Sequence, residues 1–473
     1  MPSEKRSSAV VVLGAGPGGY AAAFRAADLG LEVTLVDPEP NPGGVCLYRG
    51  CIPSKALLHV AQLLAESRAA EQWGVKFPEP QIDVARMRAW KDDVVRKLTE
   101  GLGQLSKIRN VSYLRGRGVL LDAHTLHVEC IEPHAVDVTF EHLILATGSR
   151  PATPGPLQLE SPRVWNSTDA LELQSVPRTL LVVGGGYIGL EMATVYAELG
   201  TRVTIVEMTG SLLPGVDPDL VRVVARSMER RVAALALDTR VAALGEEEDG
   251  VRAVLEKGEE KREERFDAVL VAVGRTPNSS GIGLDSTRVA ADERGFVEVD
   301  GGRRTAEASI YAIGDLAGEP MLAHKATHEG LIAAEAIAGA EAVFDPRAVP
   351  AVVFTDPEVA WCGLDEKSAT AAGFKPVAAR YPWQASGRAA TLGRTDGLTK
   401  LVVDEESERV LGAFIVGHGA GELIAEAVVA IEMGATAADM AASIHPHPTL
   451  SETLMEAADV FYGRSVHFAR KRR

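Results

Sequence analysis

Two segments of this chain repeat one pattern, and the second copy follows the first by 170 residues. In each copy an apolar run of strand character meets a Gly-x-Gly-x-x-Gly loop, continues as a helical stretch and ends in a second apolar run closed by an acid. The glycines and acids are Gly14, Gly16, Gly19 and Asp37 in the first copy, and Gly184, Gly186, Gly189 and Glu207 in the second. The pattern predicts a Rossmann-type β–α–β unit, present twice in one chain.

The spacing of these residues suits a dinucleotide for physical reasons. The first glycine permits a tight turn, the second lets a pyrophosphate approach the backbone, and the third lets the helix pack on the strand. The helix N-terminus stabilises the anion, and the acid accepts hydrogen bonds from ribose hydroxyls. We therefore expect two bound dinucleotides. Glu207 would repel a 2′-phosphate and no arginine follows within 208–215, so the second site favours NAD over NADP.

The other segments predict the order of the domains. The strands at 142–151 and 267–278 pass through small-residue turns at Gly148 and Gly274, which we expect to meet the cofactors where the chain crosses between domains. Strands and helices after about 347 indicate an antiparallel sheet with helices on one face. The predicted class is α/β, with two Rossmann-like dinucleotide-binding domains plus a C-terminal α+β interface (dimerisation) domain. The predicted bounds are 1–150 and 151–276 for the nucleotide domains, 277–346 for a central segment that completes the first site, and 347–473 for the interface domain.

Composition excludes several classes of partner. A net charge of −16 argues against nucleic acid, because no basic field attracts phosphates. No apolar run approaches the roughly 20 residues of a membrane span, and the short segment before the first strand is unlike a targeting peptide. Four cysteines are too few for a disulfide scaffold. We expect a cytoplasmic protein with no membrane or nucleic-acid partner.

Cys46 and Cys51 lie close together in the segment GGVCLYRGCIPSKALLH, with Gly50 between them. In a regular helix their separation spans about 7.5 Å and the side chains diverge, whereas a disulfide needs Cα atoms within about 7 Å. The backbone must therefore leave the helix, and Gly50 allows this. A metal site needs two further ligands that the segment lacks, and a reducing cytosol would open a structural staple. Redox chemistry is the favoured interpretation.

The position of the cysteine pair implies a flavin. The pair begins nine residues after Asp37, so it lies near the first dinucleotide. A nicotinamide delivers two electrons as hydride and a disulfide accepts them through thiolates, so a flavin is needed between them. We expect FAD in the first domain and NAD in the second. Lys55, four residues after Cys51, is positioned to stabilise an anionic flavin or thiolate; the alternative is a solvated helix lysine.

Three further residues are candidates for the site. Asp315 follows a predicted strand, where its carboxylate would meet a cofactor hydroxyl or cap the next helix. His447 lies between two prolines and is the candidate proton acceptor for thiol exchange, with Glu452 to orient its imidazole. A metal pair formed with His445 and a plain proline-rich turn are the alternatives. Because His447 is remote from Cys46 in sequence, it would come from another domain or another subunit.

The segments GGVCLYRGCIPSKALLH, GGGYIGLE, IYAIGDLAG, MLAHKATHEG and HPHPTLSE occur in this order along the chain. Together they resemble the dihydrolipoamide dehydrogenases, which are homodimeric flavoproteins of class I of the pyridine nucleotide–disulfide oxidoreductase family. The resemblance extends over residues 9–468. It implies an enzyme that oxidises protein-bound dihydrolipoyl groups through a redox disulfide and FAD, and reduces NAD to NADH.

The resemblance also implies a role for each matching residue. Cys46 resembles the interchange thiol, which exchanges with the dithiolane, and Cys51 resembles the charge-transfer thiol beside the flavin. Lys55 resembles the lysine near the flavin, which pairs with a glutamate matching Glu191. Asp315 matches the aspartate on the ribityl chain of the flavin.

The general base and the partners follow from the same resemblance. His447 resembles the base, oriented by Glu452, and in the family both reach the disulfide of the partner subunit. The implied partners are a second copy of the chain and the lipoyl domains or acyltransferase core of a 2-oxo acid dehydrogenase complex, or else a glycine cleavage carrier. No metal is implied.

The redox segment departs from the family pattern Thr-Cys-Leu-Asn-Val-Gly-Cys at Val45, Tyr48 and Arg49. We expect a lost hydroxyl and an added guanidinium to alter the thiolate pKa and the substrate fit. The basic tail at 467–473 is expected to be disordered. Two alternatives stay open: a related NAD(P)H-dependent reductase of another disulfide, and a non-catalytic flavoprotein subunit of a multienzyme complex.

Overall fold

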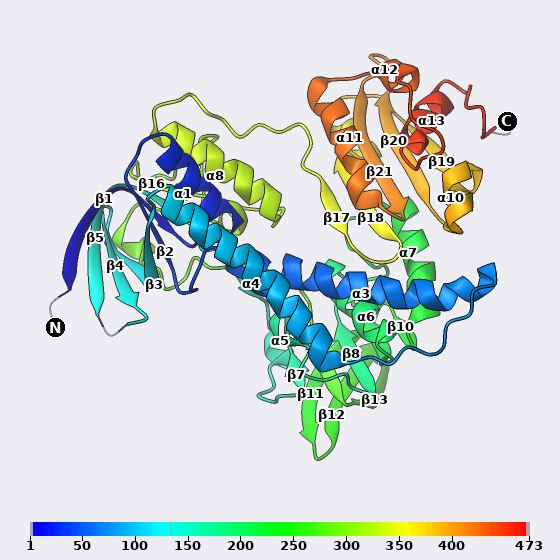
Figure 1. Cartoon of the computed structure of the whole chain (residues 1–473), viewed down its shortest axis with the longest axis horizontal. Helices are drawn as coiled ribbons and strands as arrows, with labels where there is room; N and C mark the ends of the chain where they lie inside the picture. The colour runs from blue at the N-terminus through cyan, green and yellow to red at the C-terminus, as the bar shows by residue number, and fades with distance from the viewer. Residues whose placement is uncertain (1–2, 133, 470–473) are drawn as a thin grey trace.

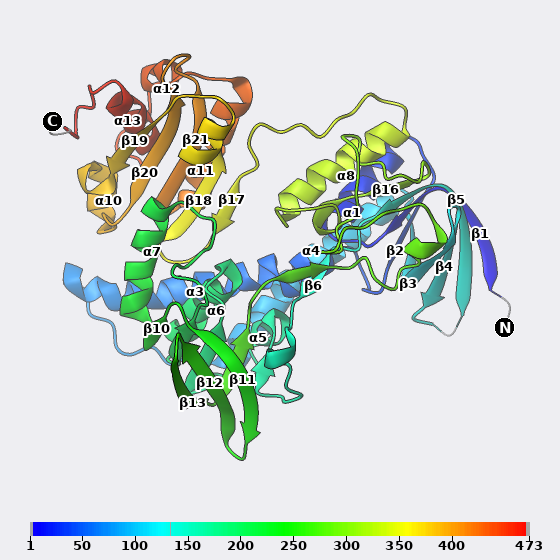
Figure 2. The ribbon, with the colours of Figure 1, turned by 180° about the vertical axis from the view of Figure 1, so that it is seen from behind.

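Three sheet-containing bodies make up the chain in the computed structural model, which describes residues 3–132 and 134–469. Figures 1 and 2 show the first body at the N-terminal end, the second below the centre and the third at the C-terminal end, with the two termini far apart. Two long helices, α3 (Cys51–Ala69) and α4 (Val84–Ile108), extend from the first body towards the second. No helix in the described ranges is long and apolar enough to cross a membrane. The C-terminal tail, 467–473, is expected to be disordered, and most of it, 470–473, lies outside the described residues.

The first body is built on a parallel sheet with an antiparallel extension. Its strands are β1 (Glu4–Leu13), β2 (Val33–Asp37), β3 (Ser112–Asp122), β4 (Thr125–Cys130), β5 (Ala135–Leu145) and β16 (Ile310–Ala312). The order β3-β2-β1-β5-β16 is parallel throughout, and β4 pairs antiparallel with β3 and β5. Alternate residues of β1 enter two different cores, one of which is shared with α1 (Pro17–Asp28) and α8 (Ala323–Ile337). Burial on both faces explains why the second half of this strand, residues 9–13, is a continuous apolar run.

The second body repeats this arrangement. Its parallel sheet has the order β10-β9-β8-β14-β7, so β8 takes the central place that β1 takes in the first body. The strands are β7 (Val164–Trp165), β8 (Thr179–Val183), β9 (Arg202–Val206), β10 (Ala234–Ala236) and β14 (Ala268–Val271). The helices are α5 (Ser167–Glu172), α6 (Tyr187–Glu198) and α7 (Pro218–Arg231). A separate antiparallel sheet contains β11 (Arg240–Glu247), β12 (Gly250–Lys257) and β13 (Glu260–Phe266).

Two short strands join the first and second bodies. β6 (Ser149–Pro151) and β15 (Arg275–Pro277) pair antiparallel, directly after the turns at Gly148 and Gly274. The two predicted crossing points therefore lie side by side, and the chain passes between the bodies there twice.

The third body is an antiparallel sheet in the order β17-β18-β21-β20-β19. Its strands are β17 (Ala351–Val353), β18 (Glu358–Gly363), β19 (Pro376–Pro382), β20 (Leu398–Asp404) and β21 (Val410–Gly417). Its helices are α9 (Glu366–Ala371), α10 (Gly387–Leu392), α11 (Ala420–Met433), α12 (Ala437–Ala442) and α13 (Glu452–Phe461). Along β20, Leu401 and Val403 pack in a core with α11 and α13, whereas Val402 packs in a core with α7. The sequence predicts helices on one face of this sheet, but both faces are covered, because α7 of the second body packs on the other face.

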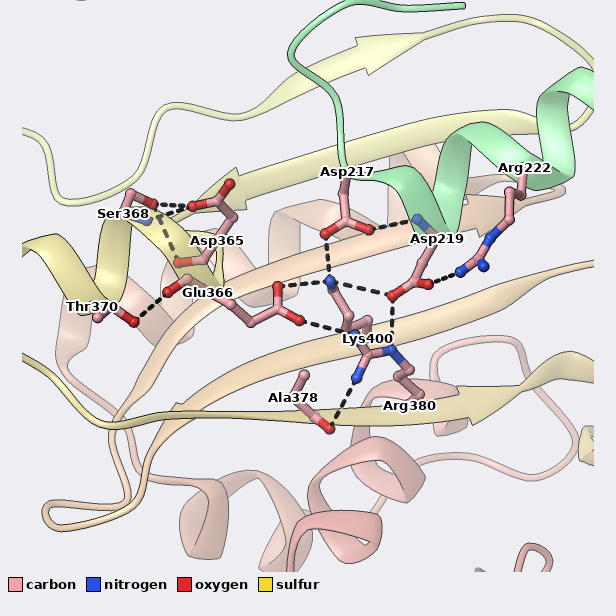
Figure 3. A network of polar contacts seen from close by, with 10 residues as sticks. All are labelled: Asp217, Asp219, Arg222, Asp365, Glu366, Ser368, Thr370, Ala378, Arg380 and Lys400. Carbon is pink, nitrogen blue, oxygen red and sulfur yellow. Dashed lines mark hydrogen bonds and ion pairs between the residues drawn. The ribbon is translucent and has the colours of Figure 1, made fainter. Parts of the chain in front are cut away.

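A network of charges with the buried Lys400 at its centre joins α7 to this sheet (Figure 3). The ammonium of Lys400 on β20 lies 2.8 Å from Glu366 Oε2 and 3.5 Å from Asp219 Oδ2, and it also pairs with Asp217. Arg380 binds Asp219 at 2.7 Å and Glu366 at 2.9 Å. Asp217 and Asp219 begin α7, so the network joins the second and third bodies.

Candidate active site

The two cysteines lie on either side of a break between two helices. Cys46 is in α2 (Gly44–Arg49), and Cys51 is the first residue of α3. Gly50 separates the helices with φ −143° and ψ −114°, so the chain leaves the helix there as the sequence predicts. A Cβ atom on Gly50 would lie 2.9 Å from the carbonyl oxygen of Val45 and 3.3 Å from the Cα of Cys46. Only a residue without a side chain fits, because the backbone folds back on itself to bring the thiols together.

The two thiols differ in acidity because one donates a hydrogen bond to the other. The bond from Cys46, together with the nearby charge of Lys55, lowers the pKa of Cys51 to about 7, although burial acts in the opposite direction. The same bond and burial raise the pKa of Cys46 above its ordinary value. Cys51 is therefore the sulfur that carries negative charge near neutral pH, and Cys46 keeps its proton.

Lys55 is held by the second body. Its ammonium lies 2.9 Å from Oε2 and 3.1 Å from Oε1 of Glu191, and 4.5 Å from the centre of the Phe354 ring. Glu191 is buried on α6 and also accepts a hydrogen bond of 3.1 Å from the amide of Phe354. One carboxylate thus connects α3, α6 and the start of the third body, and it fixes the cation one helical turn beyond Cys51.

A cavity of about 620 Å³ lies beside the thiols. Both cysteines line it, and so do Lys55 and Glu191. The other predicted site residues in its wall are Gly14, Gly16, Gly19, Asp37, Gly148 and Asp315. Asp37 accepts hydrogen bonds from the amides of Ala15 at 2.7 Å and Glu39 at 2.9 Å. Asp315 accepts one from the hydroxyl of Ser149. The structure therefore gathers the first glycine loop, its acid, the thiols and Asp315 around one space.

The second glycine loop has the same local geometry as the first. Glu207 accepts a hydrogen bond of 2.7 Å from the amide of Gly185, the position that matches Ala15 in the first copy. The hydroxyl and the amide of Thr209 also donate to Glu207, at 2.9 and 2.8 Å. The acid is therefore fixed at the tip of the loop, and the neighbouring Met208 is 74% exposed.

Tyr187 also lines the cavity, although the glycine motif did not predict it as a site residue. It follows Gly186 at the start of α6 and lines the cavity from the second body. Burial raises the pKa of Tyr187 to about 12, so it keeps its proton at neutral pH. Two sequence features could have identified Tyr187. It directly follows the second glycine of the loop, and it lies one helical turn before Glu191 on the same helix, α6.

His447 and Glu452 form the predicted pair, but away from the thiols of the same chain. The Nδ1 atom of His447 lies 2.9 Å from Glu452 Oε1, and the amide of Thr449 donates to Glu452 Oε2 at 2.8 Å. Burial opposes ionisation of Glu452, but these two bonds outweigh it and hold its pKa below the ordinary value. The His447 side chain is 71% exposed. Within the described part of the chain, the cavity wall comes from residues before 327.

Tyr48 and Arg49 bond to the segment after Asp37, and the added guanidinium of Arg49 is not among the groups that shift the pKa of Cys51, in contrast to the expectation for it. The hydroxyl of Tyr48 donates to the carbonyl of Asn41 at 3.0 Å, and Arg49 pairs with the carboxylate of Glu39. The groups that shift the pKa of Cys51 are Cys46, Lys55 and Glu191. The side chains of Tyr48 and Arg49 therefore bind residues of the segment after Asp37.

His445 takes part in a different contact from the metal pair considered for it. Its Nε2 atom lies 2.8 Å from Glu426 Oε1, and its Nδ1 atom lies 2.8 Å from the carbonyl of Ser443. Across residues 3–132 and 134–469, no group of three or more His, Cys, Asp and Glu side chains is placed to hold a metal ion.

Comparison with known proteins agrees with this geometry. The family described as pyridine nucleotide-disulphide oxidoreductase matches residues 8–330, and its dimerisation domain matches 349–458. The dihydrolipoyl dehydrogenase of Vibrio cholerae is 48% identical over 98% of this chain and 97% of its own length. That of Haemophilus influenzae is 47% identical over 98% and 96%. The crystal structure of LpdA from Mycobacterium tuberculosis has a TM-score of 0.89 at 27% identity, and the match covers 96% of this chain and 99% of that one.

Two dinucleotide-type loops, the first of them in the wall of a cavity that also holds a polarised thiol pair, define a flavoprotein disulfide oxidoreductase. The chain belongs to the pyridine nucleotide-disulphide oxidoreductase family and is of the dihydrolipoyl dehydrogenase type, with FAD and NAD as its cofactors. Its dimerisation domain supports a homodimer. The cavity fits a flavin dinucleotide on its own evidence, since it combines a glycine loop, a buried acid and the buried, unpartnered Nε of Arg49.

Proposed function

We propose that this protein oxidises protein-bound dihydrolipoyl groups to lipoyl groups and reduces NAD to NADH. The observation that carries the proposal is the polarised pair of thiols, Cys46 and Cys51, in the wall of the cavity formed by the first glycine loop. FAD, when bound, accepts two electrons from the dithiol and passes them to NAD as hydride.

The chemistry at the thiols begins from a Cys46–Cys51 disulfide. A thiolate of the dihydrolipoyl group attacks the sulfur of Cys46, the Cys46–Cys51 bond breaks, and Cys51 leaves as a thiolate. The second substrate sulfur then attacks the first, which forms the lipoyl disulfide and releases Cys46. Two electrons and two protons have left the substrate. The lowered pKa of Cys51 suits a leaving group, and the raised pKa of Cys46 suits a thiol that takes up a proton.

His447 takes the protons from the substrate thiols, and Glu452 orients its ring and stabilises the imidazolium. Because His447 is exposed and belongs to the third body, we assign it to the active site of the partner copy in a homodimer. Under this proposal one chain does not complete its own site.

The two cofactors are assigned to the two repeated units. FAD belongs to residues 1–150, with Gly14, Gly16, Gly19, Asp37, Gly148, Lys55 and Asp315 as its binding residues, and 277–346 completes the site. NAD belongs to residues 151–276, with Gly184, Gly186, Gly189, Glu207 and Gly274. The interface domain is 347–473. Support comes from the matching geometry of the two loops and from the absence of arginine in 208–215, which favours NAD.

The proposed macromolecular partner is the lipoyl domain or acyltransferase core of a 2-oxo acid dehydrogenase complex, or a glycine cleavage carrier. The proposed location is the cytoplasm, where a reducing environment keeps such a thiol pair available for catalysis.

The direct test compares two assays of the purified, flavin-loaded protein. We expect rapid formation of NADH from NAD and dihydrolipoamide, and little oxidation of NADPH by glutathione disulfide. A yellow protein that is silent in the first assay and active with another disulfide would replace the proposal by the alternative reductase.

A further inference from the structure

The redox helix α2 begins beside the first glycine loop, and its last residue lines the same cavity as that loop. At its start, the amide of Gly43 donates a hydrogen bond of 2.8 Å to the carbonyl of Ala15 inside the loop. At its end, Arg49 lines the cavity together with Asp37 and Glu39. This six-residue helix therefore carries both Cys46 and the guanidinium of Arg49, and both residues line one cofactor cavity.

The guanidinium of Arg49 is only partly used by the protein. It pairs with the carboxylate of Glu39, but its Nε is buried and has no hydrogen-bond partner. A buried donor without a partner costs free energy, and such a donor in a cavity wall is satisfied when a ligand supplies an acceptor. Glu39 orients the side chain and leaves donors of Arg49 for that ligand.

The groups around Arg49 indicate which part of FAD it would contact. Asp37 is the acid that accepts ribose hydroxyls, and the glycine loop beside it receives the pyrophosphate. Burial raises the pKa of Asp37 above its ordinary value, and the bond from the Ala15 amide and the charges of Arg49 and Arg117 oppose this; Arg117 lines the same cavity. A planar guanidinium binds phosphate oxygens through its fork of donors and also stacks on an aromatic base. Both groups belong to the adenosine diphosphate half of FAD.

We propose that Arg49 is an additional cofactor-binding residue, which contacts the adenosine diphosphate half of FAD from the helix that also carries Cys46. The inference rests on the proposed placement of FAD in this cavity. The family pattern has valine at this position, so the contact is a property of this chain rather than of the shared machinery.

The test uses the full-length chain after removal of its flavin, with Arg49→Val as the variant. Arg115→Val is the matched control, because Arg115 donates to the carbonyl of Pro38 in the same segment but does not line the cavity. The dissociation constants of FAD, ADP and riboflavin are measured by flavin fluorescence and calorimetry. Loss of one charge-assisted hydrogen bond predicts weakening of FAD and ADP by about tenfold or more in Arg49→Val. Riboflavin affinity should not change, and Arg115→Val should stay within about twofold of the wild type for all three ligands.

Equal affinity of the wild type and Arg49→Val for FAD and ADP would overturn the inference while the proposed function stands. Equal weakening in Arg49→Val and Arg115→Val would also overturn it, because Arg49 would then act only by holding the segment after Asp37. A wild-type chain that binds neither FAD nor ADP would overturn the proposed function and this inference together. Thermal stabilisation of the flavin-free chain by ADP gives a second readout that does not depend on catalysis.

Discussion

Replacement of Lys400 by methionine is expected to destabilise the junction between α7 and the C-terminal sheet by about 3–5 kcal/mol. Lys400 is buried, and its ammonium pairs with three carboxylates: Glu366 at 2.8 Å, Asp219 at 3.5 Å, and Asp217. At an effective dielectric constant of about 20, the first two pairs contribute roughly 6 and 5 kcal/mol before the cost of burying the charges. Methionine fills a similar volume but removes the cation that pairs with the buried Asp217, whereas Arg380 still pairs with Asp219 and Glu366, so the net effect is a loss of stability.

The control for this prediction is Lys375→Met in the same body. The ammonium of Lys375 lies 2.6 Å from Glu406, but the two side chains are 64% and 69% exposed. An exposed pair contributes only about 0–1 kcal/mol in spite of the short distance. Urea unfolding of the flavin-loaded protein and hydrogen exchange in β20 and α7 measure both variants. A Lys400→Met variant as stable as Lys375→Met would refute the argument that burial makes this network important.

The network also predicts an acid limit to stability. Burial opposes ionisation of Asp219, but a hydrogen bond from Arg380 and the charges of Arg380 and Lys400 hold its pKa below the ordinary 3.8. Burial also opposes ionisation of Glu366, but a hydrogen bond from Lys400 and the charges of the same two cations hold its pKa below the ordinary 4.5. Carboxylates with lowered pKa values stabilise the fold above the ordinary values, and this contribution is lost as the pH falls through the lowered ones. Unfolding free energy measured between pH 6 and pH 3 should therefore fall less steeply in Lys400→Met than in the wild type.

Three further predictions concern the site. Lys55→Met should raise the pKa of Cys51 above about 7, because a nearby cation favours the thiolate, and the pH dependence of thiol alkylation in the flavin-free protein measures it. Gly50→Ala should cost roughly 1–3 kcal/mol of stability through overpacking and should slow re-formation of the disulfide, as followed by thermal unfolding and thiol titration. Glu452→Gln should lower kcat because His447 loses its orienting carboxylate, and the loss should be smaller than the roughly 10²–10⁴-fold that a general base contributes. FAD binding should not weaken. An unchanged kcat would contradict this role.

Much of the fold could be predicted because local patterns determine it. The repeated loops place Asp37 against Ala15 and Glu207 against Gly185, which are equivalent contacts at equal spacing. Gly50 marks the break between α2 and α3, and the sequence predicts it because only glycine permits the backbone to approach so closely there. The match of Lys55 with Glu191 came from family resemblance, and the structure brings the two side chains together.

The remainder depends on contacts between distant segments. Nothing in the apolar run of β21 shows that α7, nearly two hundred residues earlier, covers one face of its sheet. The direction of Arg49 was likewise out of reach, because its pairing with Glu39 depends on how β2 and α2 are placed relative to each other. Proximity in sequence to Cys46 and Cys51 suggested an effect on the thiols that the folded chain does not show.

The most direct test of the central claim measures NADH formation from dihydrolipoamide and NAD in Cys46→Ser and Cys51→Ser, with Cys130→Ser as the control. Cys130 ends β4 and lies outside the cavity wall, so its variant should keep wild-type activity. We expect both variants of the pair to retain FAD and to lose dihydrolipoamide-dependent NADH formation. Substantial activity in either flavin-loaded variant would contradict the assignment of Cys46 and Cys51 as the redox pair.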